Sequence, residues 1–509
     1  MLPIRTEAEA YAFEHAHEPM GYRARTDMID FRPVFLVLGL LLIVVAAGMG
    51  IPAIVDLVIG NPDWAAFAVS AAFTLFVGAA TVMTTRTGEV TLTLRQAFLL
   101  TTLSWIVLPA FASVPFMISD FRLSFTDAFF EAMSGITTTG ATVITGLDNA
   151  PPGLLLWRSI LQWLGGLGII IMALTILPML KVGGMQMFKA EGFEAQEKIL
   201  PRATQLAAAL VLVFIGLTGL WAFFYWVAGM GGLDAVTHAM TTIATGGYST
   251  HDASMGYFDS PAIDTIATMG MIVGGIPFLL YVQVLRGRAD ALWNDSQVQW
   301  FVGVVVVFIG IVAGYLIFTD TYAPISAARY AAFNTVSVIT GTGYATADFG
   351  QWGGFVVVIL FMLMFVGGCA GSTTCGIKIF RFQVLFEVAR VQLRQLLQPH
   401  GVFTPYFNKR PIDDSVATSV MGFFYLYALT VCLLAIALAA LGLDFITAFS
   451  GAASAVSNVG PGLGATIGPA GTYAPLPDAA KWLLALGMLL GRLELYTVLV
   501  LVLPRFWRG

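Results

Sequence analysis

The feature that most constrains this chain is an eight-residue segment that occurs four times. The four octets are MSGITTTG at 133–140, MTTIATGG at 240–247, VSVITGTG at 336–343 and ASAVSNVG at 453–460. Each has a hydroxyl residue at its second place, a β-branched apolar residue at its fourth and a glycine at its end. The final glycines are 107, 96 and 117 residues apart, so each octet lies in a unit of similar length. This repeat predicts one structural device built four times.

Long apolar stretches predict that the chain crosses a membrane many times. Hydrophobic residues make up 58% of the 509 residues and charged residues only 11%, which excludes an ordinary water-soluble globule. A transmembrane helix needs about 20 mostly apolar residues. Ten stretches qualify, near 33–59, 62–84, 92–118, 153–181, 203–230, 261–286, 297–319, 352–380, 413–442 and 477–504.

The positions of the basic residues predict the orientation. Only Arg122, Arg158, Arg329 and Lys481, of 25 basic residues, lie near the side on which the octets open. Cytoplasmic loops carry an excess of Lys and Arg, so the octets are expected to open outward, with both termini in the cytoplasm. The first 32 residues contain no apolar run typical of a signal peptide, so the first span is expected to remain as an anchor.

From Leu92 onward, each unit has a long apolar helix, an outer turn, a short helix, the octet and a second long helix. Residues that favour helix N-caps predict where the short helices begin: Asp127, Asp234, Ser326 and Asp444. A helix of about ten residues is too short to cross a bilayer. The glycine-rich backbone after it is tolerated at membrane depth only where it lines a cavity or is buried in protein. The octets are therefore predicted to be re-entrant.

The predicted fold is an all-α polytopic membrane protein. Four helix, pore-helix and helix repeats surround a central pore with pseudo-fourfold symmetry, and a two-helix hairpin precedes them. The expected divisions are a tail at 1–32, an accessory hairpin at 33–90 and pore repeats at 91–200, 201–292, 293–411 and 412–509.

This arrangement predicts a cation-selective pore. The C-terminal end of a helix carries a partial negative charge, and four such ends directed at one point favour a monovalent cation. Backbone carbonyls can replace the hydration shell of that cation, and glycine permits the necessary backbone conformation. A single octet is better interpreted as a kinked helix or turn; four aligned copies favour the pore.

The sequence resembles the transmembrane subunit of the Trk-type bacterial potassium uptake systems, within the Trk/Ktr/HKT superfamily. The resemblance covers nearly the whole chain and is most specific in five segments. These are Ser134–Gly140, Thr245–Ser249 with the following Thr250–Ser254, Thr340–Tyr344, Asn458–Gly462 and Gly491–Tyr496. It implies potassium uptake across the bacterial inner (plasma) membrane, with K⁺ as the transported ion. The implied selectivity filter comprises Thr138, Thr139, Gly140, Thr245, Gly246, Gly247, Gly341, Thr342, Gly343, Asn458, Val459 and Gly460.

The resemblance also implies partners. They are a second copy of the chain in a homodimer, membrane lipid and a cytoplasmic TrkA-like gating subunit that binds a nucleotide or NAD. No nucleotide fold is found in this chain itself, and no nucleic acid partner is expected. The basic, aromatic segment 378–410 and the linker 181–202 are the expected docking regions for the gating subunit.

Two features are candidates for a gate. The stretch 367–376 is too rich in glycine and small polar residues to form a comfortable helix interior. The family resemblance implies a gating loop there, formed by Gly367, Gly368, Gly371, Ser372 and Gly376; close helix packing is the alternative. Arg492 lies deep in the last apolar stretch and is expected to face the conduction path below the filter, or else to serve as a structural partner. On a continuous helix Glu494 would lie about 200° away from it, so direct neutralisation is not expected.

Two other functional classes are alternatives to a pore. A symporter coupling K⁺ to H⁺ or Na⁺ also uses broken helices, but such proteins place carboxylates at the coupling site, and only Glu494 lies within a span. A haem or quinone oxidoreductase requires ligands on facing spans. The five histidines include no such pair, so an enzyme is not predicted. His238 is expected to pack behind the filter, and His251 and Asp252 to lie in an outer turn.

Overall fold

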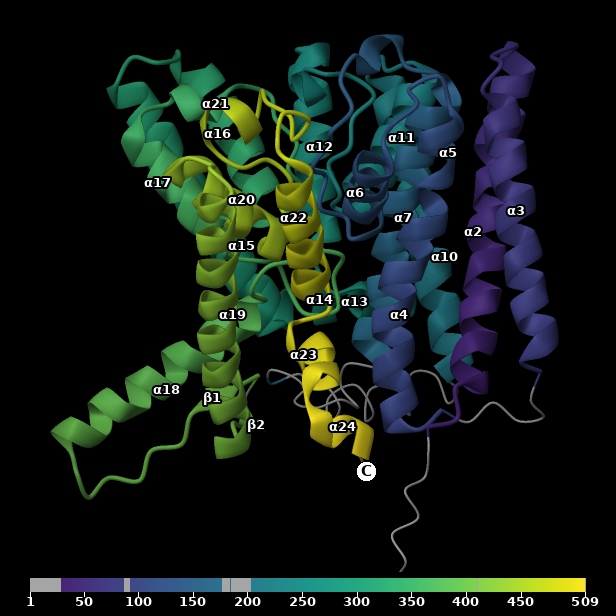
Figure 1. Ribbon diagram of the computed structural model, residues 1–509. Helices are drawn as coiled ribbons and strands as arrows, with labels where there is room; N and C mark the ends of the chain where they lie inside the picture. Colours follow the sequence, from purple (N-terminus) through teal and green to yellow (C-terminus); the bar gives the residue numbers. More distant parts are fainter. Residues whose placement is uncertain (1–28, 87–91, 176–183, 185–202, 409, 509) are drawn as a thin grey trace, which may run out of the picture.

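The computed structural model describes residues 29–86, 92–175, 184, 203–408 and 410–508, and is predominantly α-helical there (Figure 1). Its only strands in these ranges are β1 (Tyr406–Phe407) and β2 (Arg410–Pro411), an antiparallel pair. The prediction of an all-α polytopic fold is confirmed. Most of the expected tail at 1–32 and nearly all of the linker at 181–202 lie outside the described residues.

The first two helices form the predicted hairpin, α2 (Arg32–Ile59) and α3 (Trp64–Thr84). They lie close together because Gly39 and Gly78 face each other: a Cβ on either would come within 2.9 Å of the other's carbonyl oxygen. The buried Asp56 accepts a hydrogen bond from the backbone N of Gly153 at 2.7 Å. This bond ties the hairpin to the start of α7 (Pro152–Thr175).

The remaining helices follow the predicted order in four units. The first has α4 (Leu94–Ala112), α5 (Val114–Ile118), α6 (Phe125–Ile136), η1 (Leu147–Asn149) and α7; the second has α10 (Ala203–Val227), α11 (Gly232–Ile243), η2 (Ser254–Phe258), α12 (Pro261–Gly274), α13 (Phe278–Leu285) and α14 (Asp290–Asn294). The third has α15 (Ser296–Phe318), α16 (Pro324–Ile339), η3 (Phe349–Gln351), α17 (Gly354–Leu363) and α18 (Ile379–Leu397); the fourth has α19 (Asp414–Ala440), α20 (Phe445–Ser457), α21 (Gly464–Ile467), α22 (Asp478–Arg492), α23 (Tyr496–Val502) and α24 (Pro504–Arg508).

The predicted starts of the short helices are wrong in three units. Only Asp444 caps its helix, accepting a hydrogen bond from Thr447 N at 3.1 Å. The cap of α6 is Ser124, which places Asp127 inside the first turn. The caps of α11 and α16 are Gly231 and Ala323, three residues before the predicted Asp234 and Ser326, which lie in the first turns. An acidic side chain in the first turn also complements the helix dipole, so Asp127 and Asp234 mark that turn rather than the cap.

Three of the ten predicted apolar stretches are not single straight helices, and a break was predicted only for the third unit, at 367–376. Among the described residues, seven helices are long and apolar enough to cross a membrane, and two more spans are bent pairs. The pair α12 and α13 bends by 95°, at the segment Gly275-Ile276-Pro277, and the pair α22 and α23 bends by 113° after Arg492. In the third unit, the chain leaves the helix after Leu363 and re-enters it at Ile379, and α18 then projects away from the helical body (Figure 1).

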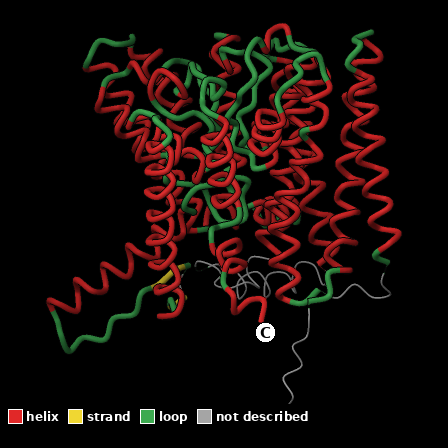
Figure 2. Tube along the Cα trace, viewed as in Figure 1, coloured by secondary structure: helices red, strands yellow, loops and turns green. Residues whose placement is uncertain are grey.

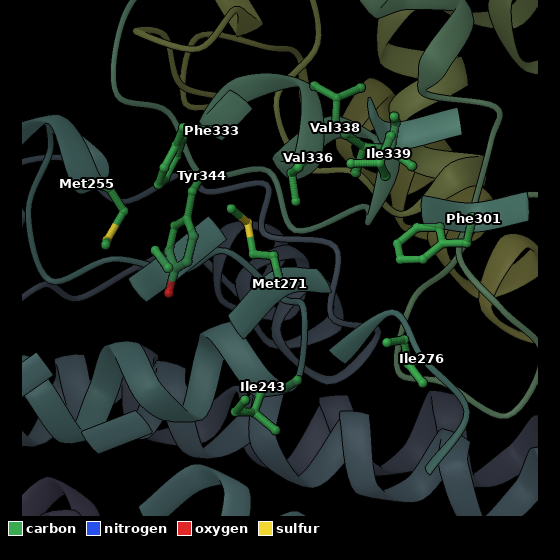
Figure 3. Close-up of a cluster of buried hydrophobic side chains, with 14 of the residues drawn as sticks. Ile243, Met255, Met271, Ile276, Phe301, Phe333, Val336, Val338, Ile339 and Tyr344 are labelled. Atoms are coloured by element: carbon green, nitrogen blue, oxygen red, sulfur yellow. The ribbon is translucent and has the colours of Figure 1, made fainter. Parts of the chain in front are cut away.

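The short helices and the loops after them lie inside the bundle, where Figure 2 shows non-helical segments enclosed by helices. A large apolar core supports them between the second and third units. It includes Ile243 of α11, Met271 of α12 and Phe301 of α15, together with Val336 and Ile339 of α16 (Figure 3). A second core joins the first and fourth units with the hairpin. The octets are thus held between two hydrophobic cores.

Candidate functional site

All four short helices end in the same way. The residue at the sixth place of each octet has a positive φ: 52° at Thr138, 49° at Thr245, 66° at Gly341 and 53° at Asn458. The backbone N of the seventh residue donates to the carbonyl of the second, at 2.9 Å, 2.8 Å, 2.9 Å and 3.0 Å in chain order. The N of the sixth donates to the carbonyl of the third at 3.0–3.3 Å. This pair of bonds is the Schellman motif that ends helices at a left-handed residue.

The glycines that close the octets form a ring. Their φ values are 84° at Gly140, 78° at Gly247, 79° at Gly343 and 104° at Gly460. A Cβ on Gly140 would overlap the carbonyl oxygen of Gly246, which belongs to the next octet. The same holds for Gly247 against Thr342 O and for Gly343 against Val459 O. The fourth contact, Gly460 against Thr139 O, closes the circle, so each octet lies beside the next and the fourth beside the first.

Charged and amide side chains hold the first two octets from behind. The buried Arg158 donates through Nε to Glu131 Oε1 at 2.8 Å and through Nη1 to Ser249 O at 2.8 Å. Its guanidinium lies 4.0 Å from the centre of the Tyr248 ring. Gln162 donates to Gly246 O at 2.5 Å and accepts from Tyr248 N at 3.0 Å. Both Arg158 and Gln162 extend from α7, so the first unit also positions the second octet.

The shared hydroxyl at the second place of the octets makes comparable contacts in three units. Thr241 Oγ1 lies 2.5 Å from Tyr344 Oη, Ser337 Oγ donates to Tyr344 O at 2.7 Å, and Ser454 Oγ donates to Gly460 O at 2.9 Å. Each of these bonds ties the short helix to the chain at or just beyond a ring glycine. His238 lies behind the second octet, fully buried, with Nε2 3.0 Å from Ser249 Oγ.

A non-helical loop at Met364–Lys378 lies directly beneath the octets. Its backbone docks on the break between α12 and α13, where Cys369 N donates to Gly275 O and Phe278 N donates to Gly371 O, both at 3.0 Å. Thr373 Oγ1 lies within hydrogen-bond distance of two carbonyl oxygens, Ile243 O at 3.1 Å and Gly274 O at 3.0 Å, and accepts from Thr245 Oγ1 at 3.1 Å. Cys375 Sγ is 4.0 Å from Thr138 Oγ1. The loop therefore contacts the first and second octets through side chains.

Arg492 joins this loop to the fourth and first units. It is 2% exposed, and its Nη1 donates to Thr373 O at 3.3 Å and to Cys375 Sγ, while Nη2 donates to Gly165 O at 3.1 Å. The helix ends at Arg492, and Glu494 and Leu495 both have positive φ, 55° and 57°. The expected geometry of a continuous helix is thus wrong here. Glu494 forms a buried ion pair with Arg381 at the start of α18.

A cavity of about 290 Å³ opens above the octets. All four ring glycines line it, together with outer-loop residues that include Tyr248 and Tyr473. At its rim, His251 Nδ1 lies 2.6 Å from Asp148 Oδ1, and its ring stacks on Tyr257. The hydrogen bond from His251 lowers the pKa of Asp148. A much smaller cavity, about 20 Å³, lies below, between the loop, Arg492 and Lys378.

The structure brings together all the residues that were singled out for the filter, and places Gly367, Gly368, Gly371, Ser372, Gly376 and Arg492 beneath them. Four supporting residues were not predicted from the sequence: Glu131, Arg158, Gln162 and Tyr344. The contact of Thr373 with the second octet was not predicted either. The available signal was an ionisable residue inside each of two apolar helices, Glu131 in the middle of α6 and Arg158 in the second turn of α7.

The fold and this fourfold site define a polytopic helical membrane protein built around a central axis. A family model described as cation transport protein, TrkH, matches residues 64–508. The chain is 47% identical over 490 residues to the Trk system potassium uptake protein TrkI of Halomonas elongata, covering 96% of this chain and 99% of that protein. It is 38% identical over 485 residues to the Trk system potassium uptake protein TrkH of Salmonella typhimurium, covering 94% and 100%.

A crystal structure of the potassium transporter TrkH from Vibrio parahaemolyticus superposes with a TM-score of 0.87 at 37% identity, covering 94% of this chain and 100% of that one. The chain belongs to the TrkH family of cation transport proteins. It is therefore a transport protein and not an enzyme.

Proposed function

We propose that this chain takes up potassium ions through the ring of octets. The observation that carries the proposal is the closed contact of each ring glycine with the carbonyl group of the neighbouring octet. Such packing directs main-chain oxygens from four units toward one axis, where they can replace the water around a cation. The names of the relatives, potassium uptake proteins, support K⁺ as the ion. The filter residues are those of the sixth, seventh and eighth places of the octets.

The geometry suits a pore more than a carboxylate-coupled symporter. The one carboxylate expected within a span, Glu494, is paired with Arg381 and lies after the break of the last span, beside the loop and not in the ring. The side chains at the sixth to eighth places of the octets include hydroxyl, amide and apolar groups but no carboxylate. Carbonyl oxygens bind an alkali cation without changing protonation, so no proton need accompany each ion.

The loop at Met364–Lys378, with Arg492, is the proposed gate. It occupies the space directly below the octets, and the small cavity left there, about 20 Å³, is close to what a single water requires. A guanidinium in that place also repels a cation. Opening then requires the loop and Arg492 to move away from each other.

The proposed gate is operated by a cytoplasmic, TrkA-like nucleotide-binding subunit, and the chain acts as a homodimer in the bacterial inner membrane with both termini in the cytoplasm. The helix α18, which projects from the body with exposed Leu393, Leu396 and Leu397, is the proposed contact region. This helix begins at Ile379, directly after Lys378 at the end of the loop. A displacement of α18 would therefore also move the loop. The other expected docking region, 181–202, lies almost wholly outside the described residues.

Reconstitution in liposomes tests this function. The purified chain is expected to admit ⁸⁶Rb⁺ and K⁺ down their gradients and to admit Na⁺ far more slowly, with a larger flux when a soluble nucleotide-binding partner is added. Flux that persists without any Na⁺ or H⁺ gradient supports the pore, whereas flux that requires such a gradient supports the symporter. Vesicles that stay impermeable to K⁺ and Rb⁺ with the partner present would overturn the proposal.

A further inference from the structure

The loop beneath the octets shares a hydroxyl contact with the second octet. Thr245 Oγ1, in that octet, lies 3.1 Å from Thr373 Oγ1, in the loop, and both side chains are buried. The Thr373 hydroxyl also lies 3.1 Å from Ile243 O and 3.0 Å from Gly274 O. A hydroxyl has one hydrogen to donate and two lone pairs to accept with. Thr373 therefore gives its hydrogen to a carbonyl and accepts the hydrogen of Thr245.

Thr245 occupies the sixth place of the second octet, where α11 has ended and the segment that leads to the ring glycine begins. Its φ of 49° is uncommon for a β-branched residue and belongs to the Schellman motif that ends α11. Its hydroxyl can alternatively bond to Ala244 O at 2.8 Å, within its own octet. Two arrangements are thus available to Thr245, one bonded to the loop and one bonded only to its own short helix.

The fit of these two threonines depends on close packing around them. A Cβ on Gly274 would lie 2.7 Å from Thr245 Cγ2 and 3.2 Å from Thr373 Oγ1. The backbone N of Thr373 also donates to Gly274 O, at 3.2 Å. The loop cannot move down without breaking these bonds, and a displaced Thr245 cannot keep its contact with the loop.

We propose that Thr373 is a positioning residue that couples the gate to the filter, so that the ion preference of the second octet depends on whether the loop is seated. This inference rests on the proposed function and adds the residue pair that links its two parts. The bond between Thr373 and Thr245 joins the loop to the octet. Its loss from the loop side is therefore expected to alter selectivity, and its loss from the octet side to alter gating.

The test measures two quantities, ion selectivity and basal flux, in isosteric variants that each remove one hydroxyl. Thr373→Val, a change in the loop, is expected to lower the K⁺/Na⁺ flux ratio in liposomes about tenfold. Thr245→Val, a change in the octet, is expected to raise the basal ⁸⁶Rb⁺ flux without any partner by a similar factor. For each readout, the double variant should change by less than the product of the two single-variant factors, since both variants remove the bond between Thr245 and Thr373. Thr373→Ser restores the hydroxyl and should restore both values.

Thr430→Val is the matched control, because the Thr430 hydroxyl, in α19, bonds to Leu426 O of its own helix and to no other group among the described residues. A Thr373→Val variant that changes the rate of flux but leaves the K⁺/Na⁺ ratio intact overturns the coupling, as do single effects that multiply in the double variant. If Thr373→Val does not assemble, the basal flux of Thr245→Val decides alone, and an unchanged value refutes the inference. Wild-type vesicles that conduct no K⁺ would instead refute the proposed function.

Discussion

Arg158 Nε donates a hydrogen bond to Glu131 Oε1 at 2.8 Å, although the two side chains are only 1% and 0% exposed. The pair links α7 to α6. Arg158 also donates a hydrogen bond to Ser249 O, just beyond the second octet. Glu131 in turn accepts from Thr142 Oγ1 at 3.0 Å and from Val143 N at 2.9 Å beyond the first octet. One buried ion pair therefore fixes the outer ends of two octets.

Removing one member of this pair is expected to destabilise the protein strongly. Arg158→Met leaves Glu131 buried without its partner, which costs about 3–5 kcal/mol in comparable buried pairs. The double variant Glu131→Leu with Arg158→Met, which leaves no unpaired charge, should recover part of the loss. The unfolding temperature in detergent measures both. Equal unfolding temperatures for Arg158→Met and the wild type would show that the pair does not support the octets.

Gly140→Ser should reduce the K⁺/Na⁺ flux ratio by about tenfold or more. The new Cβ would overlap Gly246 O and would stand at a φ of 84°, so the ring has to distort. Backbone strain of this kind costs on the order of 1–3 kcal/mol. Gly60→Ala is the matched control, because Gly60 has a φ of 82° with open space around it. It bears the same backbone strain without the overlap, and its flux ratio should equal that of the wild type.

The fourfold device could be predicted from the sequence because its signals are local. A hydroxyl residue, a β-branched residue and a closing glycine recur in fixed order, and the short helices that precede them are too short to span a membrane. The left-handed residue at the sixth place could not be found in this way. Thr138, Thr245 and Asn458 are not glycines, and only the repeated Schellman bonds reveal their shared conformation.

The breaks in the second helices of the second and fourth units were missed because glycine and proline are common in transmembrane helices. Pro277 and the glycines before it, like Gly491, gave no more than an ambiguous signal. The partner of Glu494 was missed for a different reason. Arg381 lies 113 residues away in another unit, and no helical periodicity relates two units to each other. The same limit hid the contact between Thr373 and Thr245.

Arg492→Ala is expected to raise the basal flux of Rb⁺ by about 10- to 100-fold, because hydrogen bonds from a charged donor contribute roughly 1.5–3 kcal/mol. The variant removes the bonds to Thr373 O and Cys375 Sγ that hold the loop toward the last span. Arg492→Lys keeps the charge without the planar fork and should have an intermediate flux. Arg390→Ala is the control: within the described part of the chain, Arg390 pairs with Glu387 alone, and it is half exposed. An unchanged flux in Arg492→Ala would exclude Arg492 from the gate.

The last prediction concerns acid sensitivity at the outer rim. The hydrogen bond from His251 holds the pKa of Asp148 below its ordinary value of 3.8. A carboxyl group with a lowered pKa contributes its stabilisation fully above the ordinary value, and loses it as the pH falls through the lowered one. The contribution is at most about 1 kcal/mol, because Asp148 is partly exposed and its charge is screened.

The unfolding temperature of the wild type should therefore exceed that of Asp148→Ala at pH 5. The difference should begin to shrink as the pH falls below 4. Two other carboxylates face this histidine region: Asp234 Oδ1 lies 3.7 Å from His251 Nε2, and Asp252 accepts from Leu147 N at 3.2 Å. His251→Ala should consequently lose more stability than Asp148→Ala, since it releases Asp148 and Asp234 together. Curves that stay parallel down to pH 3 would show that the bond between His251 and Asp148 does not stabilise the outer rim.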